Sequence, residues 1–479
     1  MSDADRRPFP EDEITFAIPR GARTPRGGRP NVIVFFTDQQ RWDTAGAHGN
    51  PLGLTPNFDR STREGTWVRR SFTVQPVCGP ARACMQTGRY ATQVGCHRNG
   101  LPLPEDARTL AHRFREHGYR TGYVGKWHLA GREPVPESQR GGYQAWLGAN
   151  KLEFTSDAYH TVVFDENEDP VRLPGYRVDA LTDAAVRFVD RHQDEPFFLF
   201  LSHLEPHHQN HVDGYPPPDG YRQPYEGRWT PPDLAALDGS TQQQLGGYFG
   251  MVKRLDEAYG RLLDALTSLG LRQNTVVLFT SDHGNHFKTR NAEYKRSGHE
   301  ASLRVPTVLT GGPFDGGGAL PQLVDLLDLS ATLLDVAGIE PDEDAPGRSI
   351  VPLVHRDRDD WRDEVFFQVS ESEVGRGLRT PRWKYGVTAP GADPLRDAGA
   401  ERYVESYLYD LDHDPHELAN LAGHVSHAKV ARRLRERLAA RMREAGEGDA
   451  VIEPAPEQPR YEQRQVLDDE LDDLDDLDA

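Results

Sequence analysis

The amino-acid sequence predicts an α/β fold in which helices cover both faces of a large, mainly parallel sheet. Three short apolar runs are expected to be buried strands: residues 31–38, 196–208 and 274–284. Continuous apolar runs of this length are typical of strands buried on both faces. Stretches with helical spacing of apolar residues lie between the runs, at 105–117, 177–192 and 241–269. Strands that alternate with helices favour parallel pairing through helical crossovers.

Polar residues that follow these runs are expected to meet at one edge of the sheet. Asp38, His207 and Asp282 each stand at or near the end of a run. In open parallel sheets, ligands bind beyond the carboxyl ends of the strands. The segment 209–237, rich in Pro, Gly and Tyr, is predicted to be a long loop that covers this edge.

The sequence after residue 350 predicts a smaller domain. Residues 351–450 are expected to form an α+β subdomain with an antiparallel sheet, and residues 30–350 the large domain. The expected elements are strands at 363–370, 379–388 and 405–415 and a helix at 426–445. Residues 1–29 are predicted to be an irregular arm. Residues 451–479, which end in DDELDDLDDLDA, are predicted to be an acidic, disordered tail.

Composition excludes several classes of protein. The net charge of −19 argues against nucleic-acid binding, which requires a basic face. No run approaches the roughly 18 apolar residues of a membrane helix, and the first thirty residues contain no segment that resembles a signal peptide. Three cysteines are too few for a disulfide framework, so we expect a cytoplasmic protein.

Two of the three cysteines lie in one stretch, VCGPARACMQTGRY, residues 77–90. Pro80 suits the first turn of a helix, which is expected to run through 81–86 and to stop near Gly88. Cys78 would then lie at the helix N-terminus, where backbone N–H groups and the helix dipole favour an anion. Arg82 adds a positive charge one turn further along. A cysteine in this position is placed to meet an anionic group of a substrate.

Two other roles are open for these cysteines. Cys78, Cys84, Cys96 and His97 would supply donors for zinc, although their spacing differs from the usual pairs of ligands. A helix N-terminus also activates a cysteine as a plain thiolate nucleophile. Cys84 is expected on the buried face of the helix.

The stretch CGPARACMQTGR (78–89) resembles the signature of the type I sulfatases, formylglycine-dependent enzymes of the alkaline phosphatase superfamily. The resemblance covers roughly residues 30–422. It implies an alkaline-phosphatase-like fold, a large mixed and mainly parallel sheet sandwiched by helices with a smaller C-terminal α+β subdomain, so that residues 30–350 form the catalytic domain. It also implies that a formylglycine-generating enzyme oxidises Cys78 to formylglycine (3-oxoalanine).

Two further stretches resemble the metal loops of this family: TDQQRWDTAG (37–46) and TSDHGNH (280–286). The resemblance implies the metal ligands Asp38, Gln39, Asp282 and His283, together with residue 78. Family members often carry Asp at the position of Gln39, and Asn is common at that of His283. Oxygen ligands favour Ca²⁺, whereas a histidine nitrogen leaves Mn²⁺ or Zn²⁺ as alternatives.

Other stretches resemble the catalytic segments of the family. GKWHL implies Lys126 and His128, EPHH implies His207, and YKRSGHEASLRVP (294–306) implies Lys295. By this resemblance, one hydroxyl of a hydrated aldehyde at residue 78 attacks sulfur while Asp282 accepts its proton. Lys126, Lys295 and Arg82 balance charge, His207 or Lys295 protonates the departing alcohol, and His128 takes the proton that lets sulfate leave.

The substrate side is expected to be polar or charged. Six residues are candidates to line the approach: His97, Arg98, His208, His211, Lys288 and Arg296. The expected substrate is a small-molecule or carbohydrate sulfate ester, with no nucleic-acid or membrane partner. The sequence does not indicate an oligomeric state.

Two alternatives to a sulfatase remain open. Phosphonate monoester and phosphodiester hydrolases resemble sulfatases closely and share a metal set with Gln and His, as at Gln39 and His283. A noncatalytic anion-binding protein on the same scaffold is the second alternative. Comparing sulfate, phosphonate and phosphodiester substrates separates the first, and binding without turnover by formylglycine-containing protein would indicate the second.

Overall fold

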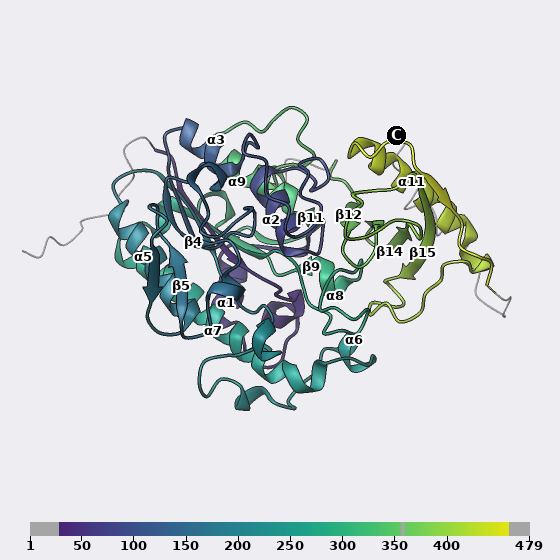
Figure 1. Ribbon diagram of the computed structural model, residues 1–479, viewed down its shortest axis with the longest axis horizontal. Helices are drawn as coiled ribbons and strands as arrows, with labels where there is room; N and C mark the ends of the chain where they lie inside the picture. Colours follow the sequence, from purple (N-terminus) through teal and green to yellow (C-terminus); the bar gives the residue numbers. More distant parts are fainter. Residues whose placement is uncertain (1–27, 356–359, 459–479) are drawn as a thin grey trace, which may run out of the picture.

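A computed structural model describes residues 28–355 and 360–458 of the chain (Figure 1). Nearly all of the arm expected at 1–29 and most of the tail expected at 451–479 therefore lie outside the described residues. Within the described residues, no helix has both the length and the apolar character needed to cross a bilayer.

The large domain is built on an 11-stranded mixed sheet in the order β11-β2-β10-β8-β1-β7-β3-β4-β5-β6, with β9 paired to β2. The strands are β1 (Asn31–Thr37), β2 (Thr66–Phe72), β3 (Arg120–Lys126), β4 (Ala145–Ala149), β5 (Thr161–Phe164), β6 (Pro170–Leu173), β7 (Phe197–Ser202), β8 (Thr275–Ser281), β9 (Arg304–Val305), β10 (Val308–Thr310) and β11 (Gly318–Asp325). The central five, from β8 to β4, are parallel. The α/β prediction with a mainly parallel sheet is confirmed.

Strand β1 shows how the sheet separates two hydrophobic cores. Val32, Val34 and Phe36 point to one core, and Ile33 and Phe35 to the other. This alternation follows from the period of two along a strand. Because every residue of β1 is buried, the run had to be apolar on both faces, which is the pattern read from the sequence.

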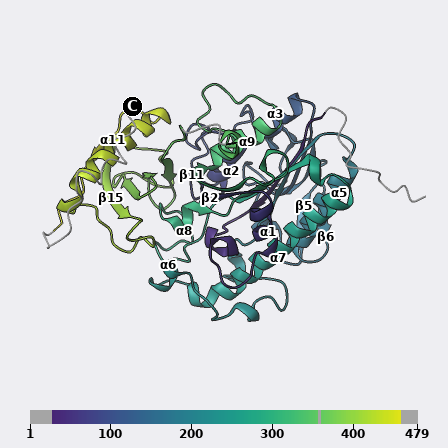
Figure 2. The ribbon, with the colours of Figure 1, turned by 180° about the vertical axis from the view of Figure 1, so that it is seen from behind.

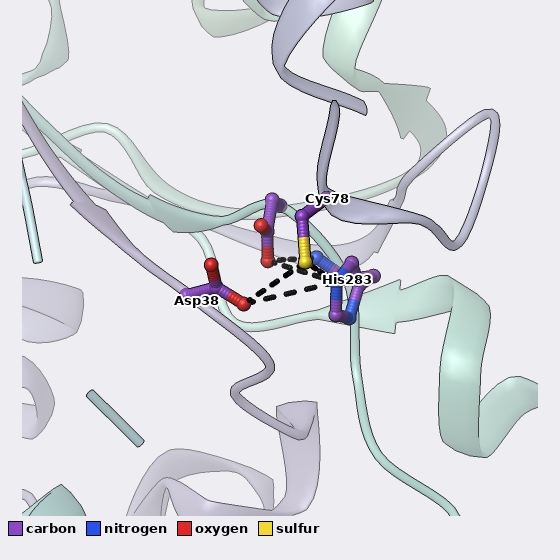
Figure 3. A group of neighbouring side chains, drawn as sticks. Asp38, Cys78 and His283 are labelled. Atoms are coloured by element: carbon purple, nitrogen blue, oxygen red, sulfur yellow. Dashed lines mark hydrogen bonds and ion pairs between the residues drawn. The ribbon is translucent and has the colours of Figure 1, made fainter. Parts of the chain in front are cut away.

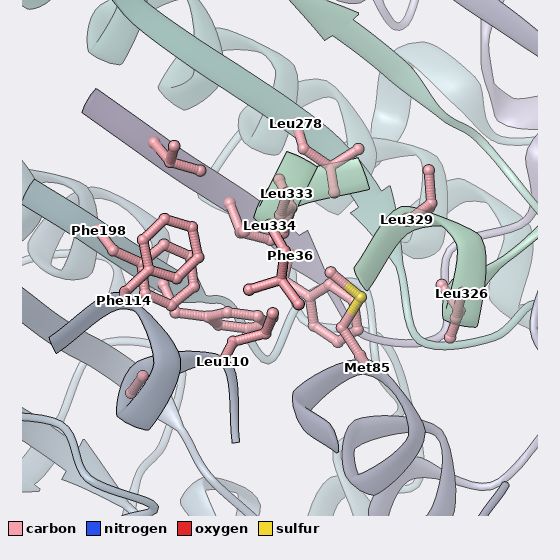
Figure 4. Close-up of a cluster of buried hydrophobic side chains, with 14 of the residues drawn as sticks. Phe36, Met85, Leu110, Phe114, Phe198, Leu278, Leu326, Leu329, Leu333 and Leu334 are labelled. Carbon is pink, nitrogen blue, oxygen red and sulfur yellow. The ribbon is translucent and has the colours of Figure 1, made fainter. Parts of the chain in front are cut away.

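Helices cover both faces of the sheet. One layer contains α2 (Cys78–Thr87), α3 (Leu110–Glu116) and α9 (Leu326–Val336), and the other contains α1 (Pro56–Glu64), α5 (Arg177–Arg191) and α7 (Thr241–Ser268) (Figures 1 and 2). Phe114 of α3 stacks on Phe198 of β7, with ring centroids 4.1 Å apart, inside the first core (Figure 4). Four one-turn helices complete the domain: α4 (Leu152–Thr155), α6 (Pro232–Ala235), α8 (Glu300–Leu303) and α10 (Val351–Val354).

The C-terminal part forms a second sheet in the order β12-β13-β14-β15-β16. Its elements are β12 (Val365–Val369), β13 (Gly375–Arg379), β14 (Trp383–Thr388), β15 (Arg402–Asp410), β16 (Val451–Glu453) and α11 (Ala428–Glu444). Strands β12 to β15 are antiparallel, as predicted. Helix α11 packs Val430, Leu434, Leu438 and Met442 into the core of this domain.

The prediction of a disordered tail from residue 451 is wrong at its beginning. Val451–Glu453 pairs with β15 in parallel register, so that Ile452 lies opposite Tyr403. Ile452 also packs against the core of the second domain. A strand of three residues carries too little pattern to stand out beside an acidic segment, and only the neighbouring strand reveals it.

Candidate active site

The carboxyl ends of two adjacent parallel strands bring the first site residues together. Asp38 follows β1 and Asp282 follows β8, and Thr37 pairs with Ser281 across the two strands. The Asp282 carboxylate accepts hydrogen bonds from the backbone N–H groups of Gln39 (2.9 Å) and His283 (2.8 Å). The side chains therefore meet at the predicted edge of the sheet.

Cys78 is the first residue of helix α2, which ends at Thr87 and is capped by Gly88. The backbone at Gly88 has φ 68°, a left-handed conformation that glycine adopts without strain. The helix was predicted over 81–86 and extends three residues further towards the N-terminus. Cys78 therefore lies at the helix N-terminus, where we expected it, and is only 1% exposed.

Four residues place potential ligand atoms within 4.8 Å of one another: Asp38, Cys78, Asp282 and His283 (Figure 3). The Sγ atom of Cys78 is 3.3 Å from His283 Nε2 and 3.6 Å from Asp38 Oδ1. The Nδ1 atom of His283 donates to the carbonyl of Gly284, which fixes the tautomer that leaves Nε2 as an acceptor.

Gln39, the remaining predicted ligand, is buried beside this group and lines the adjacent cavity. Its backbone has φ 67°, an uncommon conformation for glutamine. The N–H group of Gln39 is held by Asp282, and its carbonyl accepts from Tyr248 Oη at 2.8 Å. Its amide Nε2 donates to Tyr215 Oη at 3.3 Å. The bend in the chain thus turns this side chain towards the site.

The donor set fits a divalent cation. Asp282 Oδ2 is buried and makes no hydrogen bond within the described residues. Burial and then the nearby Asp38 carboxylate raise the pKa of Asp282 to about 7. Asp282 is poorly neutralised by the chain itself, and a cation bound beside it would stabilise its ionised form.

Two cations of the chain contact Asp38. Lys126 Nζ and Arg82 Nη2 lie 2.8 Å and 2.9 Å from Asp38 Oδ2. Burial and the nearby Cys78 would raise the pKa of Asp38. Lys126, His207 and Arg82 together lower it by more, so the pKa lies well below its usual value. Arg82 also donates to the carbonyl of Lys126 and to Ser202 Oγ. These contacts hold both cations rigidly beside Cys78.

A second pair of groups contacts Cys78 from the opposite side. Lys295 Nζ donates to Cys78 Sγ at 2.7 Å and to His207 Nε2 at 3.0 Å. His207 Nδ1 donates to the carbonyl of His208. Burial and then Lys295 lower the pKa of His207. Burial would raise the pKa of Cys78, but Lys126, Lys295 and His283 hold it well below its usual value.

His128 completes the predicted catalytic group. Its backbone has φ 63°, and its N–H donates to the carbonyl of Asn150 at 2.8 Å. The side chain lines the same cavity as Cys78. Its Nδ1 atom is buried and makes no hydrogen bond to any described residue. An imidazole with an unpaired nitrogen is available to accept a proton.

A cavity of about 280 Å³ opens above Cys78. His208 and Arg296 line it, as predicted, but His97 and Arg98 do not; the next two residues, Asn99 and Gly100, form the wall instead. Burial lowers the pKa of His97. Two further candidates are not part of the lining: His211 pairs with Asp157, and Lys288 lies over the ring of Tyr294, which does line the cavity.

The structure adds residues that the sequence did not single out. Glu153 lies 3.3 Å from Lys126 Nζ and lines the cavity with Lys151, Phe154 and Tyr294. Glu371 of the C-terminal domain accepts from Asn99 N and pairs with Arg296 Nη2, both at 2.6 Å. No local sequence signal marks these residues, because tertiary contacts alone bring them to the site.

A zinc site built from the three cysteines finds no support in the geometry. Cys84 packs in a hydrophobic cluster and Cys96 in another. Burial raises the pKa of both thiols, that of Cys96 to about 12. Within the described residues, the group that could hold a metal contains Cys78 but neither of the other two cysteines.

Comparison with known proteins agrees with this geometry. The family model described as Sulfatase matches residues 30–339, and that described as N-sulphoglucosamine sulphohydrolase, C-terminal, matches residues 292–444. The ulvan-active sulfatase of Formosa agariphila is 28% identical over 79% of this chain and 77% of that protein. Arylsulfatase A of Homo sapiens is 26% identical over 83% and 84%.

Solved structures show the same fold. A protein in complex with its substrate D-glucosamine-2-N,6-O-disulfate superposes with a TM-score of 0.73 at 23% identity, covering 88% of this chain and 99% of that one. The phosphonate monoester hydrolase of Agrobacterium radiobacter gives 0.67 at 23% identity, covering 87% and 96%. The chain belongs to the sulfatase family. It is a sulfuric ester hydrolase.

Proposed function

We propose that the protein hydrolyses a sulfate ester to inorganic sulfate and an alcohol. The reaction would use a formylglycine that is made from Cys78, together with a bound divalent metal ion, for which Ca²⁺ is our first choice. The observation that carries this proposal is the position of Cys78. Its Sγ atom stands at a helix N-terminus, touches Lys295 Nζ at 2.7 Å and lies against the group of potential metal ligands. A formylglycine-generating enzyme would carry out the oxidation.

Two groups would complete the site. Hydrated formylglycine would supply the attacking hydroxyl, whose oxygen takes the place of Cys78 Sγ, and the cation would supply positive charge for that oxygen and the sulfate. Asp38, Asp282, His283 and the Gln39 amide would hold the cation, with residue 78 as a further ligand. The donor set does not separate Ca²⁺ from Mn²⁺ or Zn²⁺.

The remaining residues would bind charge and move protons. Lys126, Arg82 and Lys295 would stabilise the negative charge of the sulfate group. Asp282 would accept the first proton at its carboxylate. Lys295 Nζ and His207 Nε2, 3.0 Å apart, share one proton that would pass to the departing alcohol. His128, whose side chain lines the cavity with Cys78, would accept the last proton.

The substrate we propose is a sulfated sugar or another small sulfate ester. One relative, of Bacteroides thetaiotaomicron, is named N-acetylglucosamine-6-O-sulfatase; it is 24% identical over 86% of each chain. The cavity wall here is polar and charged, with Lys151, His208 and Arg296 around the opening. Such a wall suits a leaving group that carries hydroxyl or charged substituents.

A second candidate is hydrolysis of a phosphonate monoester or phosphodiester. The observation in its favour is the presence of Gln39 and His283 at the metal site, the set that this rival class carries. One relative, of Trinickia caryophylli, is named a multifunctional alkaline phosphatase superfamily protein and is 24% identical over 84% of this chain. Both reactions would use the same residues.

Peptide mass spectrometry around residue 78, combined with a substrate panel, tests the proposal. We expect formylglycine at position 78 and faster hydrolysis of nitrophenyl and sugar sulfates than of phenylphosphonate esters and phosphodiesters. A large preference for the phosphorus esters would favour the second candidate. Modified protein that binds sulfate esters without turning them over would overturn both.

A further inference from the structure

The wall of the cavity above Cys78 carries two carboxylates in opposite situations. Glu153 is buried, with a side chain only 5% exposed, whereas Glu293 is 50% exposed and pairs with Arg296 at the rim. An anionic substrate has to approach both. Water and salt screen the charge at the rim but not the charge that is buried.

Glu153 is held in place by two contacts. It lies on α4, where its backbone carbonyl accepts from Gln209 Nε2 at 2.9 Å. Its Oε2 atom lies 3.3 Å from Lys126 Nζ and makes no hydrogen bond within the described residues. Lys126 is thus shared between this carboxylate and Asp38. Asp38 already provides a carboxylate partner for Lys126, so Glu153 is not needed to neutralise that lysine.

The carboxylate of Glu153 is ionised at neutral pH. Burial would raise its pKa, but Lys126, His128 and His207 outweigh burial and lower the pKa to about 2. One negative charge therefore stands permanently in a pocket built to bind an anion. Because Coulomb energy is proportional to charge, a dianion experiences twice the repulsion that a monoanion does.

We propose that Glu153 selects substrates by charge, so that the site accepts monoanionic tetrahedral esters and disfavours dianionic ones. Sulfate monoesters, phosphodiesters and phosphonate monoesters belong to the first class, and phosphate monoesters above neutral pH to the second. Glu153 is a specificity-determining residue in this scheme. The inference rests on the proposed function, because it concerns the same cavity and the same reacting group.

The first test compares nitrophenyl sulfate with nitrophenyl phosphate at a pH where the phosphate is dianionic. In E153Q, kcat/KM for the phosphate is expected to rise about tenfold relative to that for the sulfate. We compare the ratio of the two kcat/KM values because a disturbance of Lys126 would change the rates with both substrates. E153S serves as a second neutral variant, and E153D, which keeps the charge, should retain the wild-type ratio.

E293Q is the matched control, since it removes the same charge from the exposed rim. Its ratio is expected to stay within about twofold of wild type, because the rim charge is screened. An unchanged ratio in both E153Q and E153S would overturn the proposal. So would an equal shift in E153Q and E293Q, which would mean that buried and exposed charge act alike.

The second test needs no turnover. Calorimetry would measure binding of inorganic sulfate, a dianion, and methanesulfonate, a monoanion of similar shape. E153Q should tighten the binding of sulfate about tenfold more than that of methanesulfonate. If this holds while no sulfate ester is hydrolysed, the proposed function fails and the charge selection stands. Equal changes for both anions would refute the charge selection alone.

Discussion

Two buried clusters of charge can be compared in this molecule. The active-site cluster consists of Asp38, Arg82, Lys126, Asp282 and His283. The interdomain cluster consists of Glu300, Arg379, Lys384 and Glu417 and joins α8 to the C-terminal sheet. In the interdomain cluster, Lys384 Nζ lies 2.9 Å from Glu300 and 3.0 Å from Glu417, and Arg379 donates to Glu300 at 2.9 Å.

The clusters differ in how their carboxylates are neutralised. Each interdomain carboxylate has a cation within 3.0 Å. In the active-site cluster, the cation of the chain nearest to Asp282 is Arg82, whose Nη2 lies 3.4 Å from Asp282 Oδ2. In the interdomain cluster the chain supplies close counter-ions, and these ion pairs join the two domains. The active-site cluster retains charge that a ligand would have to neutralise.

The largest expected effect comes from removing the nucleophile. C78A should lower kcat/KM for sulfate esters by at least about 10⁴-fold, because no other group can form the covalent intermediate. C84A makes the same chemical change on the buried face of α2 and should leave kcat/KM unchanged. Steady-state kinetics on both variants provides the measurement, and substantial turnover by C78A would rule out the mechanism.

The interdomain cluster predicts an effect on stability alone. K384M leaves two buried carboxylates without their lysine and should lower the free energy of unfolding by about 3–5 kcal/mol. Turnover per folded molecule should stay unchanged, since this cluster lies outside the cavity lining. K253M, which breaks the partly exposed pair with Glu257 at 3.9 Å, should change stability by less than about 1 kcal/mol. Urea unfolding measures both; equal losses would contradict the assignment.

The active-site cluster predicts an unusual pH dependence for metal-free protein. The folded pKa of Asp282 is raised from 3.8 to about 7, so the native state binds this proton more tightly than the unfolded state. Stability from this group is therefore present below pH 4 and is lost as pH rises to 7. D282N should remove that part of the slope and stabilise chelated protein by about 1–3 kcal/mol at pH 7.5.

Urea titrations of chelated wild type and D282N between pH 4 and 7.5 provide the measurement. Asp38 does not obscure the result: its folded pKa is lowered below the usual 3.8, so its contribution is lost only at lower pH. Added metal should restore stability to wild type at pH 7.5. If the free energy of unfolding changed with pH in the same way for both chelated proteins, the raised pKa would not belong to Asp282.

The smallest expected effect concerns the contact between the two domains at the cavity. Glu371 holds Arg296 and the backbone of Asn99, whose Oδ1 in turn accepts from Gly79 N beside the nucleophile. E371Q should raise KM about tenfold, because a charged hydrogen bond contributes roughly 1.5 kcal/mol, with a smaller change in kcat. E373Q, whose carboxylate contacts Thr388, should leave KM unchanged. A loss confined to kcat would contradict a positioning role.

Local sequence predicted much of the fold. The strands β1 and β8 and the helices α5, α7 and α11 begin and end within three residues of their predicted limits, whereas β7 ends six residues before the predicted run does. Each buries a continuous run or an amphipathic face, so its own pattern is sufficient. Many strands were not predicted: β2 to β6 and β9 to β11 of the large sheet, and β13 and β16 of the second sheet. Their own apolar patterns are too short or too weak to stand out, so they depend on their neighbours. His97 and Arg98 were misplaced because the loop turns and presents Asn99 and Gly100 to the cavity.

The sequence alone determined the kinds of residue available and their order: a cysteine before a proline-started helix, acids at strand ends, and basic residues in separate segments. Those features are local, since helix starts and buried strands follow from neighbouring residues. Only the tertiary structure decided which groups face one another across the cavity, including Glu153 against Lys126 and Glu371 against Arg296. Those pairs join residues 27 and 75 positions apart, and their energies depend on burial and distance, which no local pattern encodes.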